Sequence, residues 1–542
     1  MMGWMSNEQG LEKTKANYVP LTPLSHLKRA SVAFPNRLAL SYGTKKYNYL
    51  QYHKRVTLLA SSLTARGINP GDVVATILPN IPAQVEAHFG IPAAGAVINT
   101  INTRLDVKTV SYIFDHGEAK IVLVDTQFLS LAKQAKKMCK GLGPEIIEVE
   151  DKEGSFTKSG DYLEYEELLN TGSENFSWRL PEDEWESLSL NYTSGTTGQP
   201  KGVVCHHRGA YLMTMGTVVS WKLQLYPKLL IIVPLFHCNG WNHTWMMPML
   251  GGTVYCCRDV TAKSIYTAIS EENITHLGGA PIVLNSIINC PEGDKKSFSH
   301  TVEIFTAGAP PAPTTLAAIE AMGFNVTQVY GLTETYGHVT ECIWDEKWDN
   351  EPQEKKSEIK ARQGVAFPMM EEITVLDENQ KEIPKDGKTL GEIVIRGNSV
   401  MKGYYKNPEA TKEAFSGGFF HSGDIAKMHD NNYIQIADRA KDIIISGGEN
   451  VSSVEVEGVL MSHPSVMLCA VVAKVDDKWG EVPCAFVELK EGLNVTEEEL
   501  IAFARTQLAG FKTPKHVFFQ DLPKTSTGKI QKFELRQKTK SL

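Results

Sequence analysis

Short apolar runs alternate with amphipathic stretches of helical length through the first three hundred residues. Residues 72–79 (DVVATILP) predict a buried strand, and residues 81–97 predict the helix that follows it. The same pattern recurs at four further apolar runs, each followed by a helical stretch. They span 119–125, 229–235, 275–281 and 302–308. Strands that are apolar throughout and alternate with helices are typical of parallel sheets covered on both faces. The pattern therefore predicts an α/β fold with mostly parallel sheets.

The pattern changes after about residue 365. Residues 372–383, 391–397 and 433–439 show the short, turn-separated alternation of antiparallel strands. From Lys441 onward, strands and helices form a unit of about one hundred residues that we expect to be a small α+β domain. The interval 438–442 (DRAKD) is the predicted domain boundary.

Composition limits the classes of function. A chain of 542 residues exceeds one hydrophobic core, and its net charge of −8 argues against nucleic-acid binding by bulk charge. Nine cysteines at irregular spacing fit a reducing compartment. Residues 229–257 lack charge, but prolines, asparagines and paired glycines interrupt them, so we expect a buried strand, loop and helix and no membrane span. The N-terminus lacks the apolar core of a signal peptide and the chain ends Lys-Ser-Leu, not Ser-Lys-Leu. We therefore expect a cytoplasmic location.

One stretch concentrates small hydrogen-bond donors around a cation. Residues 191–204 (NYTSGTTGQPKGVV) hold four hydroxyl side chains between Thr193 and Thr197, three glycines and Lys201. Glycine lets backbone N–H groups approach an anion, and hydroxyls add donors. The spacing differs from the Walker loop, and no GxGxxG occurs. The stretch predicts a phosphate-binding loop of another class; the alternative is a solvated turn between two strands.

Five further segments carry polar groups next to strands. Taken singly each is a weak signal: His237 fits a packing residue, and Lys529 fits an exposed turn. The segments are FHCNGW (236–241), YGLTET (330–335), HSGD (421–424), DRAKDIIISGGEN (438–450) and PKTSTGK (523–529).

Together, and in this order, YTSGTTGQPKG, YGLTE, GEIVIRG, SGD, DRAKD, GGEN and PKTSTGK resemble the adenylate-forming superfamily of acyl-CoA synthetases, luciferases and peptide-synthetase adenylation domains. The resemblance implies a large N-terminal domain (1–437) of covered, mostly parallel sheets plus a distorted β-barrel subdomain. It also implies a hinge at 438–442 and a small, mobile α+β domain (443–542). The implied reaction joins a carboxylic acid to ATP as an acyl-adenylate, releases pyrophosphate, and passes the acyl group to coenzyme A.

The resemblance also implies a role for individual residues, with Lys529, Glu334, Thr333 and His237 as the catalytic set. Mg²⁺ would be held by Glu334 with Thr193, because hard oxygen ligands suit it. The nucleotide and coenzyme A would be bound by the phosphate loop (Thr193, Ser194, Gly195, Thr196, Thr197, Gly198, Lys201), the base and acyl site (Gly308, Ala309, Pro310, Tyr330, Gly331, Thr333), the ribose site (Asp424, Arg439), the hinge (Lys441), the pantetheine loop (Gly447, Gly448, Glu449) and Lys529.

The motifs FHCNGW, TAGAPP and YGLTETYG are most similar to short- and medium-chain acyl-CoA synthetases, among them 3-methylmercaptopropionyl-CoA ligases and plant acyl-activating enzymes. In that subgroup His237 and Trp241 would gate the acyl site beside Gly308. Their spacing of four places them on one face of a first helical turn. A bulky Trp241 predicts a short acid, 3-(methylthio)propionate being one candidate. The subgroup's apolar positions are polar here at Asn242, His243 and His338.

Alternatives remain open at this point. One is a CoA ligase for aryl or branched-chain acids; another is a catalytically silent binding protein on the same fold. A catalytically silent protein would be expected to lose first the charged residues that are costly to bury, yet Glu334, Asp424, Arg439 and Lys529 are all present. Because the chain stops soon after Lys529, we expect a free-standing ligase and not a carrier-loading module. The expected partners are small molecules, and the sequence leaves open whether the chain is a homodimer.

Overall fold

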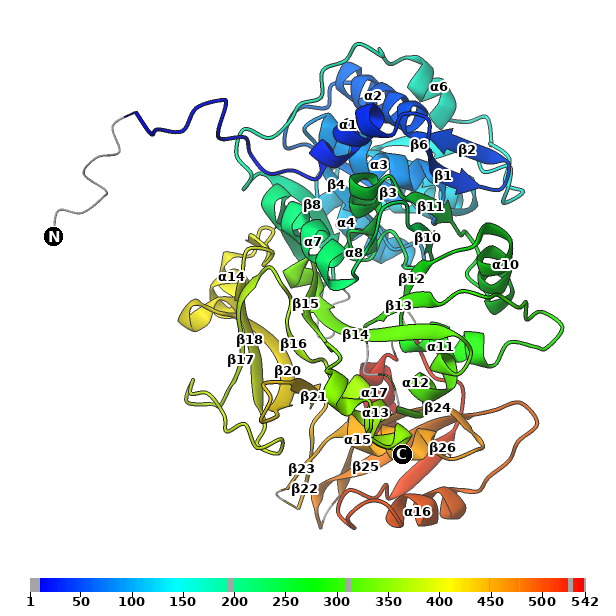
Figure 1. The fold of residues 1–542 in the computed structure, drawn as a ribbon, viewed down its shortest axis with the longest axis vertical. Helices are drawn as coiled ribbons and strands as arrows, with labels where there is room; N and C mark the ends of the chain where they lie inside the picture. Colours follow the sequence, from blue (N-terminus) through cyan, green and yellow to red (C-terminus); the bar gives the residue numbers. More distant parts are fainter. Residues whose placement is uncertain are drawn as a thin grey trace.

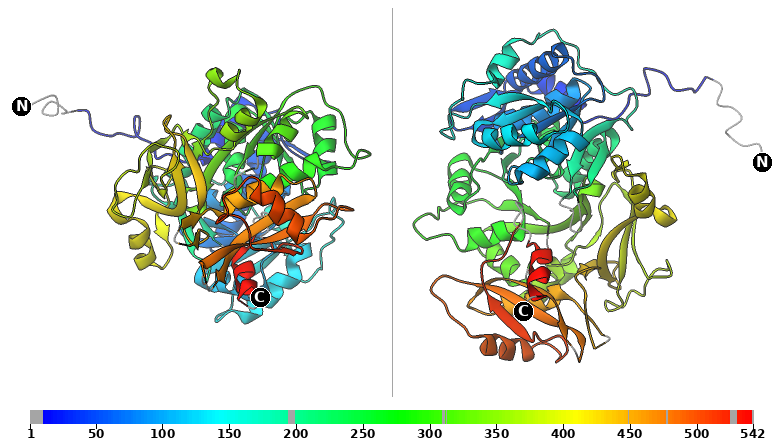
Figure 2. Two further views of the ribbon diagram at one scale, coloured as in Figure 1. Left: turned by 90° about the horizontal axis from the view of Figure 1, so that it is seen from below. Right: turned by 180° about the vertical axis from the view of Figure 1, so that it is seen from behind.

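Four sheets, stacked in tiers, organise the chain. The computed structural model describes residues 10–193, 199–308, 311, 313–447, 449–476, 478–524 and 530–540. In Figure 1 an upper tier (blue to cyan) rests on a middle tier (green), an antiparallel sheet (yellow) lies beside the middle tier, and the C-terminal unit (orange to red) lies below. Figure 2 shows the same tiers from behind, with the N-terminal segment running away from the body.

The first sheet has the strand order β19-β9-β8-β4-β3-β5-β6-β7. Its central strands pair in parallel, and β9 and β19 join antiparallel at one edge. Every residue of β3 is buried, as its apolar run predicts. Its strands are β3 (Val73–Ile77), β4 (Val97–Thr100), β5 (Ala119–Asp125), β6 (Glu145–Val149), β7 (Leu163–Glu164), β8 (Ser187–Tyr192), β9 (Gly202–His206) and β19 (Gly403–Tyr404).

The second sheet runs β16-β15-β14-β13-β12-β10-β11-β1-β2 and is parallel from β14 to β1. The prediction of mostly parallel sheets is therefore confirmed. Residues 229–257 contain the expected strand, loop and helix, followed by a further strand that the sequence analysis did not predict. The strands are β1 (Leu38–Tyr42), β2 (Lys45–Asn48), β10 (Lys228–Ile231), β11 (Thr253–Cys256), β12 (His276–Gly279), β13 (Val302–Thr306), β14 (Phe324–Leu332), β15 (Gly337–Glu341) and β16 (Val365–Ala366).

Helices cover the faces of these two sheets. Helix α2 begins directly after β2, and a reciprocal cap between Asn48 and Gln51 satisfies two otherwise unpaired N–H groups of its first turn. The principal helices are α1 (Leu24–Ala33), α2 (Tyr49–Ala65), α3 (Pro82–Ala93), α4 (Val107–His116), α5 (Leu129–Met138), α6 (Tyr165–Asn170), α7 (His207–Ser220), α10 (Ala262–Glu272), α11 (Pro281–Ile288), α12 (Pro313–Glu320), α13 (Gln353–Lys360) and α14 (Pro408–Ala414). No helix of the described residues is long and apolar enough to cross a membrane.

The antiparallel region forms an open sheet in the order β17-β18-β20-β21. The strands are short and joined by turns, as the sequence pattern predicts. Among the described residues this sheet does not close into the expected barrel, because β17 and β21 remain its two edges. Its strands are β17 (Met370–Leu376), β18 (Gly391–Gly397), β20 (Phe420–Met428) and β21 (Ile434–Arg439).

The C-terminal unit has a sheet and core of its own. Apolar side chains of α15, β24 and β25, including Val456, Val471 and Val487, pack into one cluster. The elements are β22 (Ile444–Ser446), β23 (Glu449–Val451), β24 (Val466–Asp476), β25 (Gly480–Leu489), β26 (His516–Phe519), α15 (Ser453–Met461), α16 (Glu497–Arg505) and α17 (Lys532–Thr539). The α+β expectation fits these elements. The boundary and hinge at 438–442 remain a prediction.

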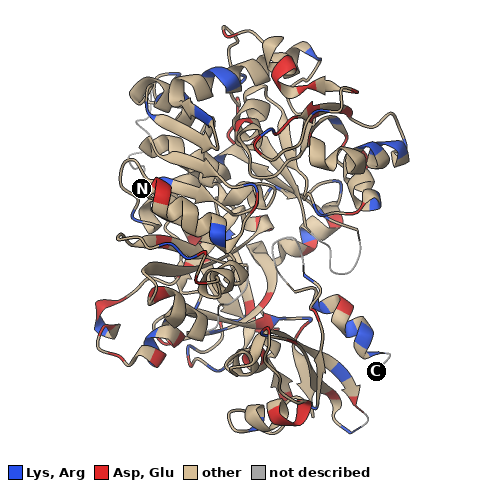
Figure 3. Ribbon diagram, turned by 90° about the vertical axis from the view of Figure 1, so that its right-hand side faces the viewer, with Lys and Arg blue, Asp and Glu red and all other residues tan. Residues whose placement is uncertain are grey.

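Acidic and basic residues are interspersed along the ribbon in Figure 3. This mixture agrees with the modest net charge of −8.

Candidate active site

The sequence motifs meet where strands of the two large sheets end. Strand β8 leads into the glycine–hydroxyl stretch, and β12, β13 and β14 end at Gly279, Thr306 and Leu332. Ligands of open α/β sheets bind at the carboxyl ends of the strands. The topology thus places the base of the predicted phosphate loop, the FHCNGW segment and the YGLTET segment near the ends of these strands.

The predicted phosphate loop joins the two antiparallel strands β8 and β9 of a β-hairpin. Tyr192 pairs with Gly202, and the Thr193 backbone N–H donates to the Lys201 carbonyl at 3.0 Å. The two ends of the loop are therefore fixed. The predicted ligands Ser194, Gly195, Thr196, Thr197 and Gly198 lie outside the described residues.

Lys201 and Glu334 are joined through a tyrosine that sequence reasoning missed. The Lys201 ammonium lies 4.5 Å from the centre of the Tyr404 ring, and the Tyr404 hydroxyl donates to Glu334 Oε1 at 3.0 Å. Tyr404 comes from β19, which pairs with β9 beside the loop. Burial raises the pKa of Glu334, while the Tyr404 hydrogen bond and the charges of Arg439 and Lys201 oppose that shift. The loop cation and the predicted metal ligand thus share one partner, with nothing in the local sequence to mark it.

Tyr330, Asp424 and Arg439 are brought together from two sheets. The Tyr330 hydroxyl donates to Asp424 Oδ2 at 2.7 Å, and Arg439 Nε lies 2.9 Å from Asp424 Oδ1. Asp424 and Arg439 face each other in the register of β20 and β21. Asp424 is buried, so its charge is stabilised by these two donors. This pairing agrees with the adjacent roles that the resemblance implies for them.

The remaining predicted residues occupy separate places. Gly308 has a φ of +91°, and a Cβ there would lie 3.9 Å from that of Ala280, an ordinary contact. Gly331 lies opposite His338 in the β14–β15 register. Lys441 and Glu449 are exposed at the start of the C-terminal unit. Gly447 has a φ of +62° under the Trp479 ring, where a Cβ would come within 2.8 Å. The predicted residues Ala309, Pro310, Gly448 and Lys529 lie outside the described residues.

The prediction that His237 and Trp241 share the face of a helical turn is wrong. Every residue from Cys238 to Asn242 has a positive φ, between 40° and 63°, so this turn is left-handed. A left-handed turn does not stack side chains four apart as a right-handed helix does. Each non-glycine residue in it costs roughly 1–2 kcal/mol, so neighbouring interactions must hold it in place.

Asn239, at the centre of this turn, makes the stabilising contacts and is fully buried. Its Oδ1 accepts from Asn191 Nδ2 and from the Tyr336 hydroxyl, both at 2.9 Å, and its Nδ2 donates to Thr100 Oγ1 at 3.2 Å. Asn191 belongs to β8, two residues before the phosphate loop, and Tyr336 belongs to YGLTETYG. A second link runs from the Cys238 thiol to the Thr333 hydroxyl at 3.4 Å. One amide thus ties three motifs together.

We expect Asn239→Ala to raise the KM for both ATP and the acid by about tenfold. The change leaves buried polar groups unpaired, at about 1–3 kcal/mol each, and loosens the strand that leads into the phosphate loop. Steady-state kinetics with each substrate varied, together with thermal unfolding, measure this.

Asn239→Gly is the matched control for the backbone, because glycine adopts the positive φ without strain. If the amide matters, Gly and Ala variants are equally impaired. Recovery of both KM values in the glycine variant would show instead that only the backbone conformation counts.

Oxygen donors suited to Mg²⁺ are present, in the Glu334 carboxylate and the Thr193 hydroxyl. Within the described ranges no three His, Cys, Asp or Glu side chains converge on a point where they could hold a metal. Mg²⁺ in phosphoryl-transfer sites is usually bound by one or two carboxylates together with substrate phosphates. The residues present therefore fit an ion that is bound together with ATP.

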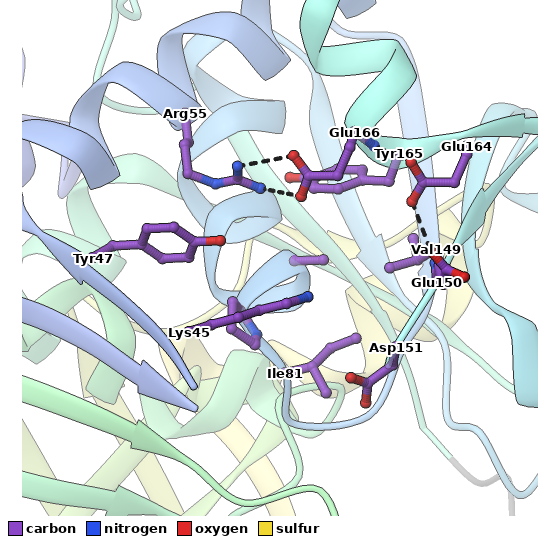
Figure 4. A pocket seen from close by; sticks show the side chains of 12 residues that line it. Lys45, Tyr47, Arg55, Ile81, Val149, Glu150, Asp151, Glu164, Tyr165 and Glu166 are labelled. Carbon is purple, nitrogen blue, oxygen red and sulfur yellow. Dashed lines mark hydrogen bonds and ion pairs between the residues drawn. The ribbon is translucent and has the colours of Figure 1, made fainter. Parts of the chain in front are cut away.

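A separate polar hollow of about 20 Å³ lies in the upper tier, between β2, α2, β6 and α6 (Figure 4). Arg55 donates there to Glu86 and Glu166, and Lys45 and Asp151 line the other side. The space holds about one water molecule. None of the motif residues lines it, so it is no part of the candidate site.

Comparisons with known proteins agree with this geometry. Residues 27–405 match the family model described as AMP-binding enzyme, and residues 455–529 match the AMP-binding enzyme C-terminal domain. The chain is 46% identical to the peroxisomal acetate/butyrate–CoA ligase of Arabidopsis thaliana, over 98% of this chain and 97% of that protein. It is 42% identical to the peroxisomal trans-cinnamate:CoA ligase of Petunia hybrida, over 98% and 96% of the two chains.

Solved structures show the same architecture. ATP-bound MatB from Rhodopseudomonas palustris matches with a TM-score of 0.81 and 26% identity, over 95% of this chain and 99% of that one. The anthranilate CoA ligase AuaEII with bound anthranoyl-AMP matches in fold with a TM-score of 0.84 at 23% identity, over 97% and 99% of the two chains. The matched motifs, the family models covering both parts of the chain and these relatives lead to one conclusion: the chain belongs to the AMP-binding enzyme family, as an acyl-CoA synthetase.

Proposed function

We propose that this protein activates a short- to medium-chain carboxylic acid with ATP, as an acyl-adenylate, and transfers the acyl group to coenzyme A. The observation that carries the chain length is the position of Trp241. Its indole is buried and fills the space beside Gly278 near the end of β12, where a Cβ would lie 3.0 Å from the ring. A ring in that place leaves little depth for a long acyl chain.

Relatives support a short acid without fixing which one. Curated relatives more than 40% identical to this chain are named as ligases for acetate or butyrate, 2-methylpropanoate, trans-cinnamate and benzoate. We include 3-(methylthio)propionate among the candidate acids because of the motif resemblance. An aryl or branched-chain acid is the second candidate. The His338 ring, which lies against Trp241 and is itself contacted by Phe305, favours it by offering aromatic contacts.

The residues of the site would act by position and charge. Two anions, the acid and the ATP α-phosphate, have to meet, so catalysis depends on alignment and on neutralising developing charge. Lys201 and the loop from Thr193 would hold the β- and γ-phosphates, and Thr333 would reach the α-phosphate. Tyr330, Asp424 and Arg439 would hold adenine and ribose, and His237 would border the acid. Mg²⁺, bound by Glu334 and Thr193, would supply further charge neutralisation.

The second half-reaction would use the C-terminal unit. We propose that it turns about Lys441 and brings Gly447, Gly448 and Glu449 to the pantetheine thiol. The nucleotide site and the C-terminal unit are neighbours in the chain: Arg439 contacts Asp424, while Asp438 accepts from the Ser453 backbone and hydroxyl, both at 2.6 Å. The cytoplasmic location remains a prediction; several relatives are named as peroxisomal.

Pyrophosphate release with a series of straight-chain acids tests the function and the role of Trp241 together. We expect kcat/KM to rise up to about four to eight chain atoms and then fall. An open channel would reward each added methylene by roughly 0.8 kcal/mol, about fourfold. Trp241→Ala should shift the optimum to longer acids.

Trp245→Phe is the control. Trp245 is also a buried tryptophan, but its indole N–H donates to the His88 carbonyl, and we do not assign it to the acyl gate. Palmitate as the best wild-type substrate, or an unchanged profile in Trp241→Ala, would contradict the gate. An absence of acid-dependent pyrophosphate release with every acid would contradict the function itself.

A further inference from the structure

Among the described residues, two histidines beside Trp241 have buried side chains that make no hydrogen bond. His243 is 0% exposed and His338 is 2% exposed. Within the described part of the chain, neither ring nitrogen of either histidine has a hydrogen-bond partner. Leaving a buried polar group unpaired is costly, and most such groups in proteins are satisfied. Four unpaired nitrogens in one small region therefore call for an explanation.

The two imidazoles flank the indole that we propose as the acyl gate. The centre of the His338 ring lies 4.9 Å from that of Trp241, and the centre of the His243 ring lies 5.9 Å away, both edge to face. His338 lies opposite Gly331 in the sheet register, next to the predicted adenine residue Tyr330. A Cβ on Gly278 would lie 3.0 Å from both Trp241 and His243. The pair thus belongs to the wall of the proposed acyl site.

Both imidazoles are uncharged near neutral pH. Burial lowers the pKa of His338 to about 3, and burial together with His338 and His276 lowers the pKa of His243 well below its usual value. A neutral imidazole has one N–H donor and one acceptor nitrogen. It can therefore both donate to and accept from a hydroxyl group, without the cost of a buried charge.

Two other histidines of the same region, one buried and one partly buried, have hydrogen-bond partners. His88 contacts the Thr244 hydroxyl at 2.7 Å and the Leu235 carbonyl at 3.2 Å, and His276 contacts the Thr275 hydroxyl at 2.7 Å. Histidines that only pack in this part of the core therefore also form hydrogen bonds. Among the buried histidine side chains of the described residues, only those of His243 and His338, which lie against Trp241, have both ring nitrogens unpaired.

We propose that His243 and His338 form a hydroxyl-recognition site, which selects short acids carrying a hydroxyl on carbon 3 or 4 over the unsubstituted acid of equal length. This inference rests on the proposed function, since it assigns the acid of that same site. A site built to hydrogen-bond a substrate hydroxyl rejects the analogue that lacks it, because its own polar groups then stay unpaired. An ordered water between the rings is the competing occupant.

The test compares butyrate with 3-hydroxybutyrate and 4-hydroxybutyrate in the complete reaction with ATP and coenzyme A. We expect the wild-type kcat/KM of at least one hydroxy acid to exceed that of butyrate by about tenfold or more. His338→Phe should abolish that preference by lowering the kcat/KM of the hydroxy acid to that of butyrate or below. His276→Phe, which replaces a partnered histidine of the same cluster, should keep the preference.

His338→Gln covers the case in which phenylalanine does not fold, because an amide retains a donor and an acceptor. It should keep more of the preference than the phenylalanine variant, with thermal unfolding checked for each. A wild-type enzyme that prefers butyrate over both hydroxy acids would overturn the inference and favour the water. So would a preference that survives in His338→Phe. Turnover of butyrate with no hydroxyl preference defeats only this inference, whereas no turnover of any acid defeats the proposed function.

Discussion

Replacing Lys529 by alanine is expected to abolish acyl-adenylate formation and to leave thioester formation from supplied acyl-adenylate largely intact. Lys529 ends PKTSTGK, and the family resemblance assigns it to the first half-reaction only. One well-placed donor to developing charge contributes roughly 3–4 kcal/mol, or about 10²- to 10³-fold in rate. In the second half-reaction the C-terminal unit would have turned, so the lysine would no longer lie at the phosphates.

The surrounding structure makes this a local change. Although Lys529 itself lies outside the described residues, its loop is closed by a bridge between Lys524 and Ile530, and Lys524 is paired with Glu488 at 2.6 Å. The base of the loop is therefore held by contacts of described residues on either side of it. Pyrophosphate exchange measures the first step, and thioester formation from synthetic acyl-adenylate measures the second.

Lys540→Ala, at an exposed lysine after α17, serves as the control and should affect neither step. If a folded Lys529→Ala protein loses both activities, the lysine does not separate the half-reactions. Retained adenylation would remove it from the catalytic set altogether.

The sequence could predict the parallel sheets because burial on both faces leaves a direct mark, a run of apolar residues such as 119–125. It could not predict the turn at Cys238–Asn242. Its residues take a left-handed conformation that local preference disfavours, and the compensating hydrogen bonds come from Asn191 and Tyr336. Tyr404 is hidden from the sequence for a similar reason: the pairing of β19 with β9 places it, and it then hydrogen-bonds to Glu334, 70 positions away along the chain. In both cases tertiary contacts outweigh the local signal.

The unpaired histidines mark the opposite situation. The sequence shows polar residues at positions 243 and 338, where the similar enzymes are more apolar. It does not show what these two side chains contact. The packing shows that both rings lie against Trp241 and that, among the described residues, neither has a hydrogen-bond partner. The length of the acid would be set by the indole, and its polarity by the imidazoles on either side.

Glu334→Gln is expected to raise the Mg²⁺ concentration needed for half-maximal adenylation by at least tenfold while leaving the fold intact. The carboxylate is the predicted hard ligand, and even outer partners of metal ligands are worth about 10- to 100-fold in metal affinity. Glutamine keeps the shape and can still accept the Tyr404 hydrogen bond now made to Oε1.

The free energy of unfolding of Glu334→Gln should not be lower than that of the wild type, because the pKa of Glu334 is raised in the folded protein. A carboxyl whose pKa is higher in the folded than in the unfolded protein destabilises the fold as pH rises through the folded pKa. Removing the ionisable group removes that cost, so the melting temperature of Glu334→Gln near neutral pH should equal or exceed that of the wild type. Tyr404→Phe, which removes the hydroxyl but keeps the carboxylate, should change the Mg²⁺ requirement much less. An unchanged Mg²⁺ dependence in the glutamine variant, or a loss of activity matched by a loss of folded protein, would show that Glu334 does not bind the ion.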